Sequence, residues 1–454
     1  MQQRAIQGRR FSVIGGARSG IAVASLLKAH GGEVFLSDKA PAARMQSAVA
    51  ELDKREVAYE FGGNTSRVLD AEVVVLSPGV PSDVPVVREA KRAGRPVVSE
   101  IEVASWFCPA PIVAITGTNG KTTTTTLVGR MFEDARKPAV VAGNIGLAFS
   151  QVVEQLTAQS TAILEVSSFQ LDHIETFKPK VSVWLNVTPD HLDRYEHDYE
   201  KYIAAKCRVF ENQRSRDVLV YNADDDTETK HVRSHVHPAV TLLPFSTRKQ
   251  LEEGAFVDQG LVKVRFHGKE TEVLPARDIS LRGEHNLSNA LAAVLVSYVM
   301  GVSTASVKST LKNFKGVEHR LEFVRVVNGV TFINDSKATN VDSVWYALQS
   351  FDSPIVLFLG GRDKGNDYSR LSDLVRKHVK AIVAIGESSG KVVEAFTPIV
   401  RVTTASDMKT AVQEAAAVAG PGDIVLLSPA CASFDWFENY EHRGRVFKDI
   451  VHAL

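Results

Sequence analysis

The feature that most limits how this chain can fold is a glycine loop placed between a strand-like segment and a helix-like segment. The apolar residues 112–115 lead into Thr-Gly-Thr-Asn-Gly-Lys-Thr at 116–122, and a helical pattern begins at once. Strand, glycine loop, Lys-Thr and helix in this order form a phosphate-binding loop. A glycine-rich stretch alone often marks only a turn, but the four parts together favour nucleotide binding.

The residue types of this loop suit a nucleotide. Gly117 and Gly120 let backbone amides turn toward one point, where the start of the following helix adds partial positive charge. Lys121 can reach the β- and γ-phosphates, and the Thr122 hydroxyl is placed to ligate Mg²⁺. The usual pattern has a glycine five residues before Gly120, where this chain has Ile115, so the loop is a variant.

Short apolar runs alternate with helical patterns along most of the chain. This alternation predicts parallel, doubly wound α/β sheets. The expected strands are residues 11–14, 33–36, 73–76, 112–116, 162–165, 181–186, 330–334, 355–360, 381–385 and 424–427. Period-two alternation with glycines at 255–273 predicts a small antiparallel insertion, and helices are expected at 286–300 and 305–313.

A chain of 454 residues is too long for one hydrophobic core, so several domains are expected. We place boundaries near Ile101 and Gly316. The predicted domains are an N-terminal Rossmann-like domain at 1–100, a central phosphate-loop α/β domain at 101–316 and a C-terminal Rossmann-like domain at 317–454.

The composition excludes several classes of protein. Basic and acidic residues are equal at 53 each, so no global charge draws the chain to nucleic acid or an anionic membrane. The three cysteines form no C-x-x-C pair, which argues against a disulfide framework or a thiolate zinc site and suits a reducing cytosol. The polar, basic start lacks a signal peptide's apolar core, and no apolar run is long enough to span a membrane. We expect a cytoplasmic protein without membrane or nucleic-acid partners.

Polar residues follow two further strands. Glu165 ends the strand at 162–165, and Asp190 and His191 follow the strand at 181–186. The carboxyl ends of parallel strands share one edge of a sheet, so Glu165 would lie beside the phosphate loop, where Mg²⁺ needs a ligand. A paired structural carboxylate and a hydrogen-bonded loop histidine are the plain alternatives for Glu165 and His191. Two strand ends beside one phosphate loop favour the functional interpretation.

Lys206 lies in a helical stretch at 199–211. It borders the apolar stripe formed by Tyr199, Ile203, Cys207 and Phe210. Taken alone, this position predicts a solvated lysine whose stem covers apolar surface.

Residues 116–122 resemble the ATP loop of the Mur ligases of bacterial cell-wall synthesis, and the likeness runs from about Phe11 to the C-terminus. Four other segments are similar to the branch of that family that adds D-glutamate. They read Leu-Glu165-Val-Ser-Ser-Phe-Gln-Leu, Asn-Val-Thr-Pro-Asp-His191-Leu-Asp-Arg-Tyr, Phe-Ile-Asn-Asp335-Ser-Lys337-Ala-Thr339-Asn and Leu-Ser-Pro-Ala-Cys-Ala-Ser433-Phe434-Asp-Trp-Phe. The Asp-Asn-Pro-Arg motif of the branch that adds a diamino acid is absent, as is the Gly-Thr-His-Gly-Lys loop of the branch that adds L-alanine. The likeness is weakest in the first domain and at 255–273.

The resemblance implies an ATP-dependent amide ligase. It would activate the carboxylate of UDP-N-acetylmuramoyl-L-alanine as an acyl phosphate and join it to the amine of D-glutamate. Lys121, Glu165, His191 and Lys206 would be catalytic, with Lys206 carbamylated by CO₂ into an anionic ligand. Two Mg²⁺ ions are implied, held by Thr122, Glu165, His191 and modified Lys206.

The resemblance also implies three groups of binding residues. ATP would contact Gly117, Thr118, Asn119, Gly120, Lys121, Thr122, Thr123, Asn286, Asn289, Arg320 and Asp335. The uridine nucleotide would contact Arg18, Ser19, Asp38, Ser77, Pro78, Gly79, Asn144 and His191. D-Glutamate would contact Lys337, Thr339, Lys364, Ser433, Phe434 and Tyr440. Without the resemblance, Lys364 is a loop charge, and Phe434 and Tyr440 belong to a helix core.

Other functions stay open on the sequence alone. The alternative function most similar to the one implied is that of a related amino-acid ligase, such as a folylpolyglutamate synthetase. A less similar alternative is a nucleotide-regulated binding module without turnover. A dehydrogenase is the third, but Ala17 stands where the dinucleotide fingerprint of the first glycine turn needs glycine. We expect small-molecule substrates only, and a monomer.

Overall fold

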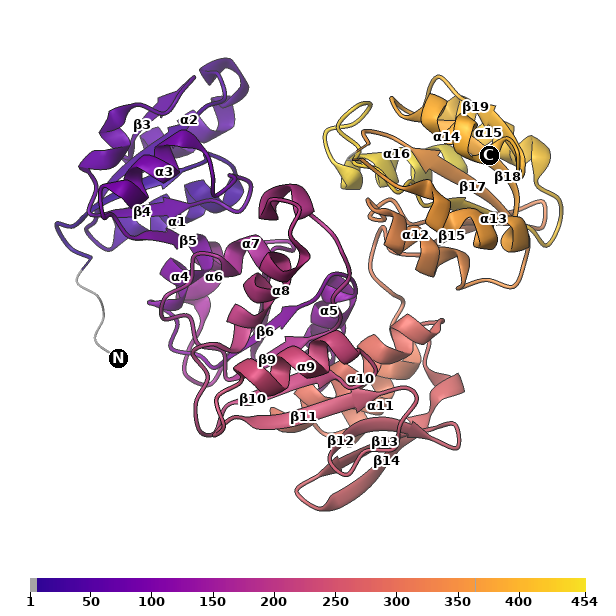
Figure 1. Cartoon of the computed structure of the whole chain (residues 1–454), viewed down its shortest axis with the longest axis horizontal. Coiled ribbons are helices and arrows are strands. Elements are labelled where there is room, and N and C mark those ends of the chain that lie inside the picture. The colour runs from indigo at the N-terminus through magenta and orange to yellow at the C-terminus, as the bar shows by residue number, and fades with distance from the viewer. Residues whose placement is uncertain (1–5, 364) are drawn as a thin grey trace. The chain divides into compact units, whose positions relative to one another are not determined.

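The computed structural model describes residues 6–363 and 365–454, with the Ser47 side chain left aside. The described chain is built from three sheets flanked by helices, which confirms the predicted α/β class (Figure 1). The chain divides into two compact units. The first unit is Met1–Ser280 with Leu287–Phe314, and the second is Leu281–Asn286 with Lys315–Leu454. The first unit holds the first two sheets, and the second unit holds the third. Lys364, predicted to contact D-glutamate, lies outside the described residues.

The first sheet is parallel, in the order β3-β2-β1-β4-β5. Its strands are β1 (Arg10–Ile14), β2 (Glu33–Asp38), β3 (Ala58–Phe61), β4 (Val73–Leu76) and β5 (Val97–Ser99). Its helices are α1 (Arg18–Ala29), α2 (Gln46–Lys54), α3 (Pro85–Arg92) and α4 (Glu100–Ser105). The strand order reverses between β1 and β4, and in such sheets ligands bind outside the carboxyl ends of the strands at this point.

The second sheet has nine strands in the order β14-β13-β12-β11-β10-β9-β6-β8-β7. Its parallel part is β6 (Ile112–Thr116), β7 (Ala139–Gly143), β8 (Thr161–Glu165), β9 (Val181–Trp184), β10 (Val218–Asn222) and β11 (Thr241–Ser246). Its helices include α5 (Lys121–Asp134), α6 (Phe149–Val152), α7 (Ser168–Leu171), α8 (Tyr199–Cys207), α9 (Asp226–His235), α10 (Glu284–Val299) and α11 (Thr304–Asn313). Because β6 lies between β8 and β9, the phosphate loop and both predicted polar strand ends emerge at one edge.

The predicted insertion is antiparallel, but it is not separate from the central sheet. β12 (Gly254–Asp258), β13 (Leu261–Phe266) and β14 (Lys269–Pro275) form two antiparallel pairs. β12 also pairs in parallel with β11, so the insertion extends the central sheet at its edge. Sequence alternation reports only which side chains face inward, and it carries no information on which strand the insertion joins.

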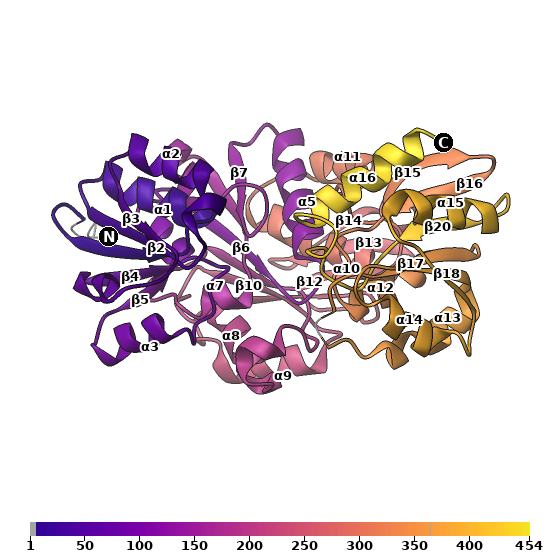
Figure 2. The ribbon, with the colours of Figure 1, turned by 90° about the horizontal axis from the view of Figure 1, so that it is seen from above.

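The third sheet has the order β15-β16-β20-β17-β18-β19. Its strands are β15 (Glu322–Val327), β16 (Val330–Asn334), β17 (Ile355–Gly360), β18 (Val379–Ile385), β19 (Arg401–Thr404) and β20 (Ile424–Leu427). Its helices are α12 (Val341–Leu348), α13 (Ser372–His378), α14 (Ser389–Phe396), α15 (Met408–Val418) and α16 (Tyr440–His452), seen from a second direction in Figure 2. Only β15 runs antiparallel to its neighbour. β20 lies between β16 and β17, and the strand order reverses at this position, as it does between β1 and β4 in the first sheet.

The ten strands predicted as parallel elements are confirmed to within two residues at their ends. Seven others were not expected, namely β3, β5, β7, β10, β11, β15 and β19. Several are short or carry polar residues, as in Arg401-Val-Thr-Thr of β19, and the sheet rather than the local pattern defines them. Across the described ranges, no helix is long and apolar enough to cross a bilayer.

Candidate active site

The phosphate loop joins β6 to α5 and depends on its two glycines. Gly117 has φ +156° and Gly120, which precedes the first helical residue, has φ +81°. A Cβ atom on Gly120 would lie 2.2 Å from Oδ1 of Asn289, a residue only 4% exposed. Glycine is required at 120 because the backbone is left-handed there and the neighbouring helix α10 leaves no room. Asn289, predicted to contact ATP, thus lies directly against the loop.

The loop is held by the segment after β9. The Asn119 amide donates a hydrogen bond to Oδ1 of Asn186 (2.8 Å), and Nδ2 of Asn186 donates to the Asn119 carbonyl (3.1 Å). Oγ1 of Thr118 donates to the Thr188 carbonyl (3.0 Å) and lies 3.0 Å from the Tyr202 hydroxyl. These bonds set the loop shape before any ligand arrives, so the cost of ordering it at binding is small.

Lys121 reaches back over the loop that precedes it. Its Nζ donates to the carbonyls of Gly117 and Thr118, each at 2.8 Å. The ammonium group is therefore held at the loop, at the start of the fourteen-residue helix α5, where the helix dipole also favours anions. These groups are the ones that the sequence predicts for an anion site, and binding of an anion there stays a prediction.

Thr122 and Glu165 meet at the ends of neighbouring strands. Oγ1 of Thr122 donates to Oε2 of Glu165 at 2.6 Å, and Nδ2 of Asn144 lies 3.3 Å from Oε1 of the same carboxylate. Both residues of the pair are at most 2% exposed. A hydroxyl and a carboxylate oxygen beside an anion site are the donors that Mg²⁺ prefers, so this pair fits a magnesium ion.

Lys206 is not the solvated lysine that its helix position predicts. The residue is 1% exposed, and its Nζ donates to the Gly117 carbonyl at 2.8 Å and lies 4.6 Å from the centre of the Tyr202 ring. Burial, reinforced by the nearby charge of Lys121, lowers the pKa of Lys206 well below its usual value. The prediction was wrong because α8 is buried over a wider face than its apolar stripe, and this face includes Lys206.

Asp190 and His191 lie in the loop after β9, at the same edge of the sheet. His191 has a left-handed backbone, with φ +51°, and its side chain is 39% exposed. Its ring stands edge-on to Phe169, with 6.2 Å between the centroids. The charge of Asp190 acts on Lys206 and favours its protonated form, against the effect of burial. A shared metal between His191 and Lys206 stays a prediction.

Most residues predicted for the uridine nucleotide lie near the switch point of the first sheet, whereas Asn144 and His191 belong to the central sheet. The Ser77 hydroxyl donates to the Gly15 carbonyl (2.9 Å), and the Gly16 amide donates to Oδ2 of Asp38 (2.6 Å). Nη1 of Arg18 donates to the Gly146 carbonyl (3.0 Å), two residues beyond Asn144. Ser19 follows in the first turn of α1. Pro78 and Gly79 adjoin Ser77, and their carbonyls lie 3.2 and 3.5 Å from the Arg194 guanidinium.

The second unit holds the described residues predicted for D-glutamate, and it places two of them, Lys337 and Tyr440, near each other. Nζ of Lys337 lies 5.1 Å from the centre of the Tyr440 ring, and Tyr440 is the first residue of α16. Ser433 is 2% exposed and follows β20, whereas Phe434 is 60% exposed and precedes α16. The alternative that places Phe434 in a helix core is therefore wrong. Thr339 is half-buried in the loop after β16.

Asp335 directly follows β16 in the second unit. Its Oδ2 accepts a hydrogen bond from the Ser428 hydroxyl at 2.7 Å. Burial raises the pKa of its carboxyl to about 7. Asn286 and Arg320, which are also predicted ATP contacts, belong to this unit, and Nδ2 of Asn286 donates to the Arg282 carbonyl.

Arg443 supports the loops of this region, and the sequence did not predict this role. It is 1% exposed, and its guanidinium donates to the Ser336 carbonyl (2.7 Å) and to the Cys431 carbonyl (3.1 Å). It thereby joins the loops that follow β16 and β20. An arginine on an amphipathic helix such as α16 is ordinarily exposed, so no sequence signal could have found it. Asn186 and Tyr202, which support the phosphate loop, were also missed.

These features define a class of protein. A buried hydroxyl–carboxylate pair beside a phosphate loop, in a chain of several α/β sheets, is typical of nucleotide-dependent enzymes.

Comparison with known proteins narrows this class. Family models match the chain as the Mur ligase MurD-like N-terminal domain (residues 9–99), the Mur ligase middle domain (115–297) and the Mur ligase glutamate ligase domain (319–431). The UDP-N-acetylmuramoylalanine–D-glutamate ligase of Salinibacter ruber is 50% identical over 99% of both chains. The protein of that name from Chloroherpeton thalassium is 45% identical over the whole of both. The chain therefore belongs to the Mur ligase family, the ATP-dependent ligases of peptidoglycan precursor synthesis.

Solved structures are similar in fold. The crystal structure of UDP-N-acetylmuramate-alanine ligase MurC from Thermotoga maritima gives a TM-score of 0.60 at 19% identity, covering 98% of this chain and 99% of that one. At this identity the likeness supports the architecture alone.

Proposed function

We propose that this protein is the ligase that joins D-glutamate to UDP-N-acetylmuramoyl-L-alanine, with hydrolysis of ATP to ADP and phosphate. The observation that carries the proposal is the full-length likeness, at 50% and 45% identity, to two proteins that bear this name. The strand-end site agrees with it, because an anion site and a buried hydroxyl–carboxylate pair are what phosphoryl transfer from ATP requires.

We infer a division of labour among the predicted domains. Residues 1–100 would hold the uridine nucleotide, residues 101–316 would hold ATP, and residues 317–454 would hold D-glutamate. The family models at 9–99, 115–297 and 319–431 agree with these boundaries. The enzyme would act as a cytoplasmic monomer on small molecules only.

The reaction has to overcome the charge of its substrate. A carboxylate is a poor electrophile, so its oxygen first takes the γ-phosphoryl group of ATP, which forms an acyl phosphate and releases ADP. The neutral amine of D-glutamate then attacks the acyl carbon, the bond from that carbon to the phosphate oxygen breaks, and the amine proton goes to the departing phosphate as the amide forms. Both partners of the first step are anions, so the main task of the site is to neutralise charge.

Lys121, the loop amides and the start of α5 supply positive charge on the ATP side of this reaction. Thr122 and Glu165 would hold Mg²⁺, which neutralises phosphate charge when bound. The intermediate is easily hydrolysed, so the site must exclude water during the reaction.

We further propose that Lys206 is carbamylated, and the burial of its amine supports this proposal. Only a neutral amine attacks CO₂, and burial, which lowers the pKa of Lys206 well below its usual value, favours that form. The new bond joins Nζ to the carbon of CO₂, one amine proton goes to solvent, and the product is a carboxylate. Such a carboxylate and His191 are the residues that would hold a second Mg²⁺.

A single assay tests the proposed function. Purified protein is supplied with ATP, Mg²⁺ and UDP-N-acetylmuramoyl-L-alanine, and phosphate release is measured with D-glutamate, L-glutamate, L-lysine or L-alanine. We expect turnover with D-glutamate alone, and none when the nucleotide sugar is omitted. Preference for L-glutamate would instead indicate a polyglutamate-adding ligase. Nucleotide binding without turnover on any of the four amino acids would indicate a binding module.

A further inference from the structure

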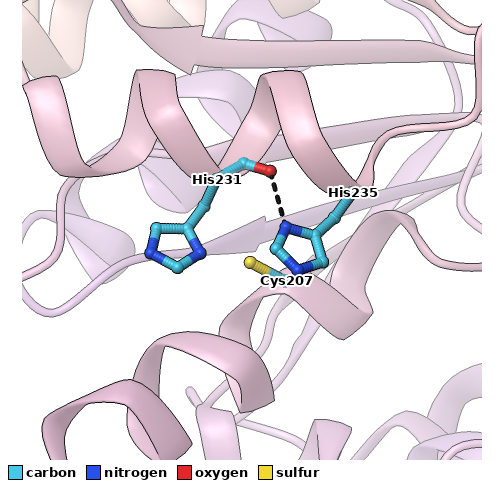
Figure 3. Close-up of side chains that lie close together, drawn as sticks. All are labelled: Cys207, His231 and His235. Atoms are coloured by element: carbon cyan, nitrogen blue, oxygen red, sulfur yellow. Dashed lines mark hydrogen bonds between the residues drawn. The ribbon is translucent and has the colours of Figure 1, made fainter.

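A group of metal-ligating side chains lies outside the proposed active site, between two helices of the first unit. Cys207 ends α8, and His231 and His235 lie on α9, which packs beside α8 (Figure 3). Each residue offers one ligand atom, and the three atoms lie within 4.8 Å of one another. Because His231 and His235 are four residues apart, both imidazoles project from one face of α9.

The ring contacts of the two histidines leave nitrogen lone pairs for a ligand. Nδ1 of His235 lies 2.9 Å from the His231 carbonyl oxygen, which can only accept, and 3.1 Å from the Ser234 hydroxyl, which donates to the Lys230 carbonyl; these contacts favour the proton on Nδ1. In the neutral ring, Nε2 of His235 is then the unprotonated nitrogen. Nε2 of His231 lies 3.4 Å from Oε2 of Glu200, and both imidazoles are stacked with 5.5 Å between their centroids. A carbonyl or carboxylate on the second ring nitrogen is the usual partner of a metal-ligating histidine.

We propose that Cys207, His231 and His235 form a Zn²⁺ site that ties α8 to α9. One thiolate and two imidazoles are ligands that suit Zn²⁺, whereas Mg²⁺ prefers oxygen. Tetrahedral zinc, with Zn–S of about 2.3 Å and Zn–N of about 2.0–2.1 Å, sets its ligand atoms about 3.3–3.6 Å apart, so modest side-chain movements would close the site. Water would take the fourth position, with the Glu200 carboxylate beside the His231 ring, and the thiol proton would go to solvent.

The sequence argued against such a site because the cysteines form no C-x-x-C pair. Here the folded helices bring one cysteine to two histidines that are 24 and 28 positions away. The plain alternative is a buried apolar thiol beside histidines that favour the end of a helix. That alternative explains each residue singly, but it gives no reason for three donor atoms to converge. His235 is exposed, so an ion can approach from solvent.

The proposal does not depend on the ligase function, although Cys207 directly follows Lys206 in α8. A bound ion would hold the end of the helix that presents Lys206 to the phosphate loop. It would also raise the thermal stability of the protein, because it binds the folded state in preference to the unfolded one.

Cobalt(II) titration of the reduced full-length protein tests the site, because Co²⁺ replaces Zn²⁺ and reports thiolate ligation through a near-ultraviolet charge-transfer band. We expect one Co²⁺ per chain with this band, displaced by equimolar Zn²⁺ and unaffected by excess Mg²⁺. Ion bound only at Thr122 and Glu165 has oxygen ligands and gives no such band, so the two locations are distinguishable.

Variants identify the ligands. Cys207→Ser should abolish the band, and His235→Gln, at an exposed position that folding tolerates, should weaken Zn²⁺ affinity by at least about tenfold. Cys108→Ser and His237→Gln alter a cysteine and a histidine outside the cluster and should leave both properties unchanged. Absence of the band in the parent protein, or its persistence in Cys207→Ser, would overturn the proposal. Equal zinc affinity in His235→Gln and the parent protein would also overturn it.

Discussion

Gly120→Ala probes the structural basis of the phosphate loop. The backbone at Gly120 is left-handed, with φ +81°, and a Cβ atom there would lie 2.2 Å from Oδ1 of Asn289. Asn289 is 4% exposed and lies on α10, so its side chain is packed against other atoms rather than facing solvent. The added methyl group therefore has to displace either the loop or Asn289.

The expected loss of unfolding free energy in Gly120→Ala has two parts. Holding an alanine in the left-handed region costs about 1–2 kcal/mol relative to glycine. Forcing an extra methyl group into a packed site adds about 1–3 kcal/mol. Gly94→Ala isolates the first part, because Gly94 has φ +69° and a Cβ atom added there would meet no other atom within 4 Å. We expect Gly120→Ala to destabilise the protein by about 2–5 kcal/mol and Gly94→Ala by only about 1–2 kcal/mol.

The assay compares both variants with the parent protein by urea unfolding and by the ATP dependence of phosphate release. Displacement of the loop should raise the KM for ATP at least about tenfold in Gly120→Ala, equivalent to about 1.4 kcal/mol of lost binding. Gly94 lies in the turn after α3 of the first sheet, so its variant should keep the ATP dependence of the parent. Equal losses of stability in the two variants, with an unchanged KM for ATP, would refute the argument from crowding.

Three lysine and aspartate positions give further predictions. Lys121→Ala should abolish ADP formation while binding of the uridine substrate, measured by calorimetry, is retained; near-normal turnover would reject its role in neutralising phosphate charge. Lys206→Ala should lose activity and regain part of it with added formate or acetate, whereas Lys201→Ala, at an exposed site on the same helix, should stay active; full activity of Lys206→Ala without rescue would reject the carbamate. Burial raises the pKa of Asp335 to about 7 from an ordinary 3.8, so the folded state keeps a proton that the unfolded chain releases. The unfolding free energy of the parent should therefore fall between pH 4 and pH 7 relative to Asp335→Asn, by on the order of 2–4 kcal/mol, and parallel pH profiles in denaturant would contradict this.

The local units of this protein follow from its amino-acid sequence alone. Strand, glycine loop, Lys-Thr and helix are adjacent in the chain, so the phosphate loop could be predicted before any packing was known. The period of apolar residues likewise indicated the ten parallel strands, because a buried strand is visible as a run of apolar residues. Glu165 could be placed beside the loop because parallel strands end at a common edge.

Packing between elements sets which faces are buried and which distant segments meet. Lys206 and Arg443 lie on helices whose local pattern predicts solvent, yet both are 1% exposed because their polar ends reach backbone carbonyls of other segments. The β12–β14 hairpins join the central sheet, and Cys207 meets His231 and His235, through contacts between residues far apart in the chain. Local periodicity records the amphipathic character of each element, but burial and ligand geometry depend on the partner that packs against it.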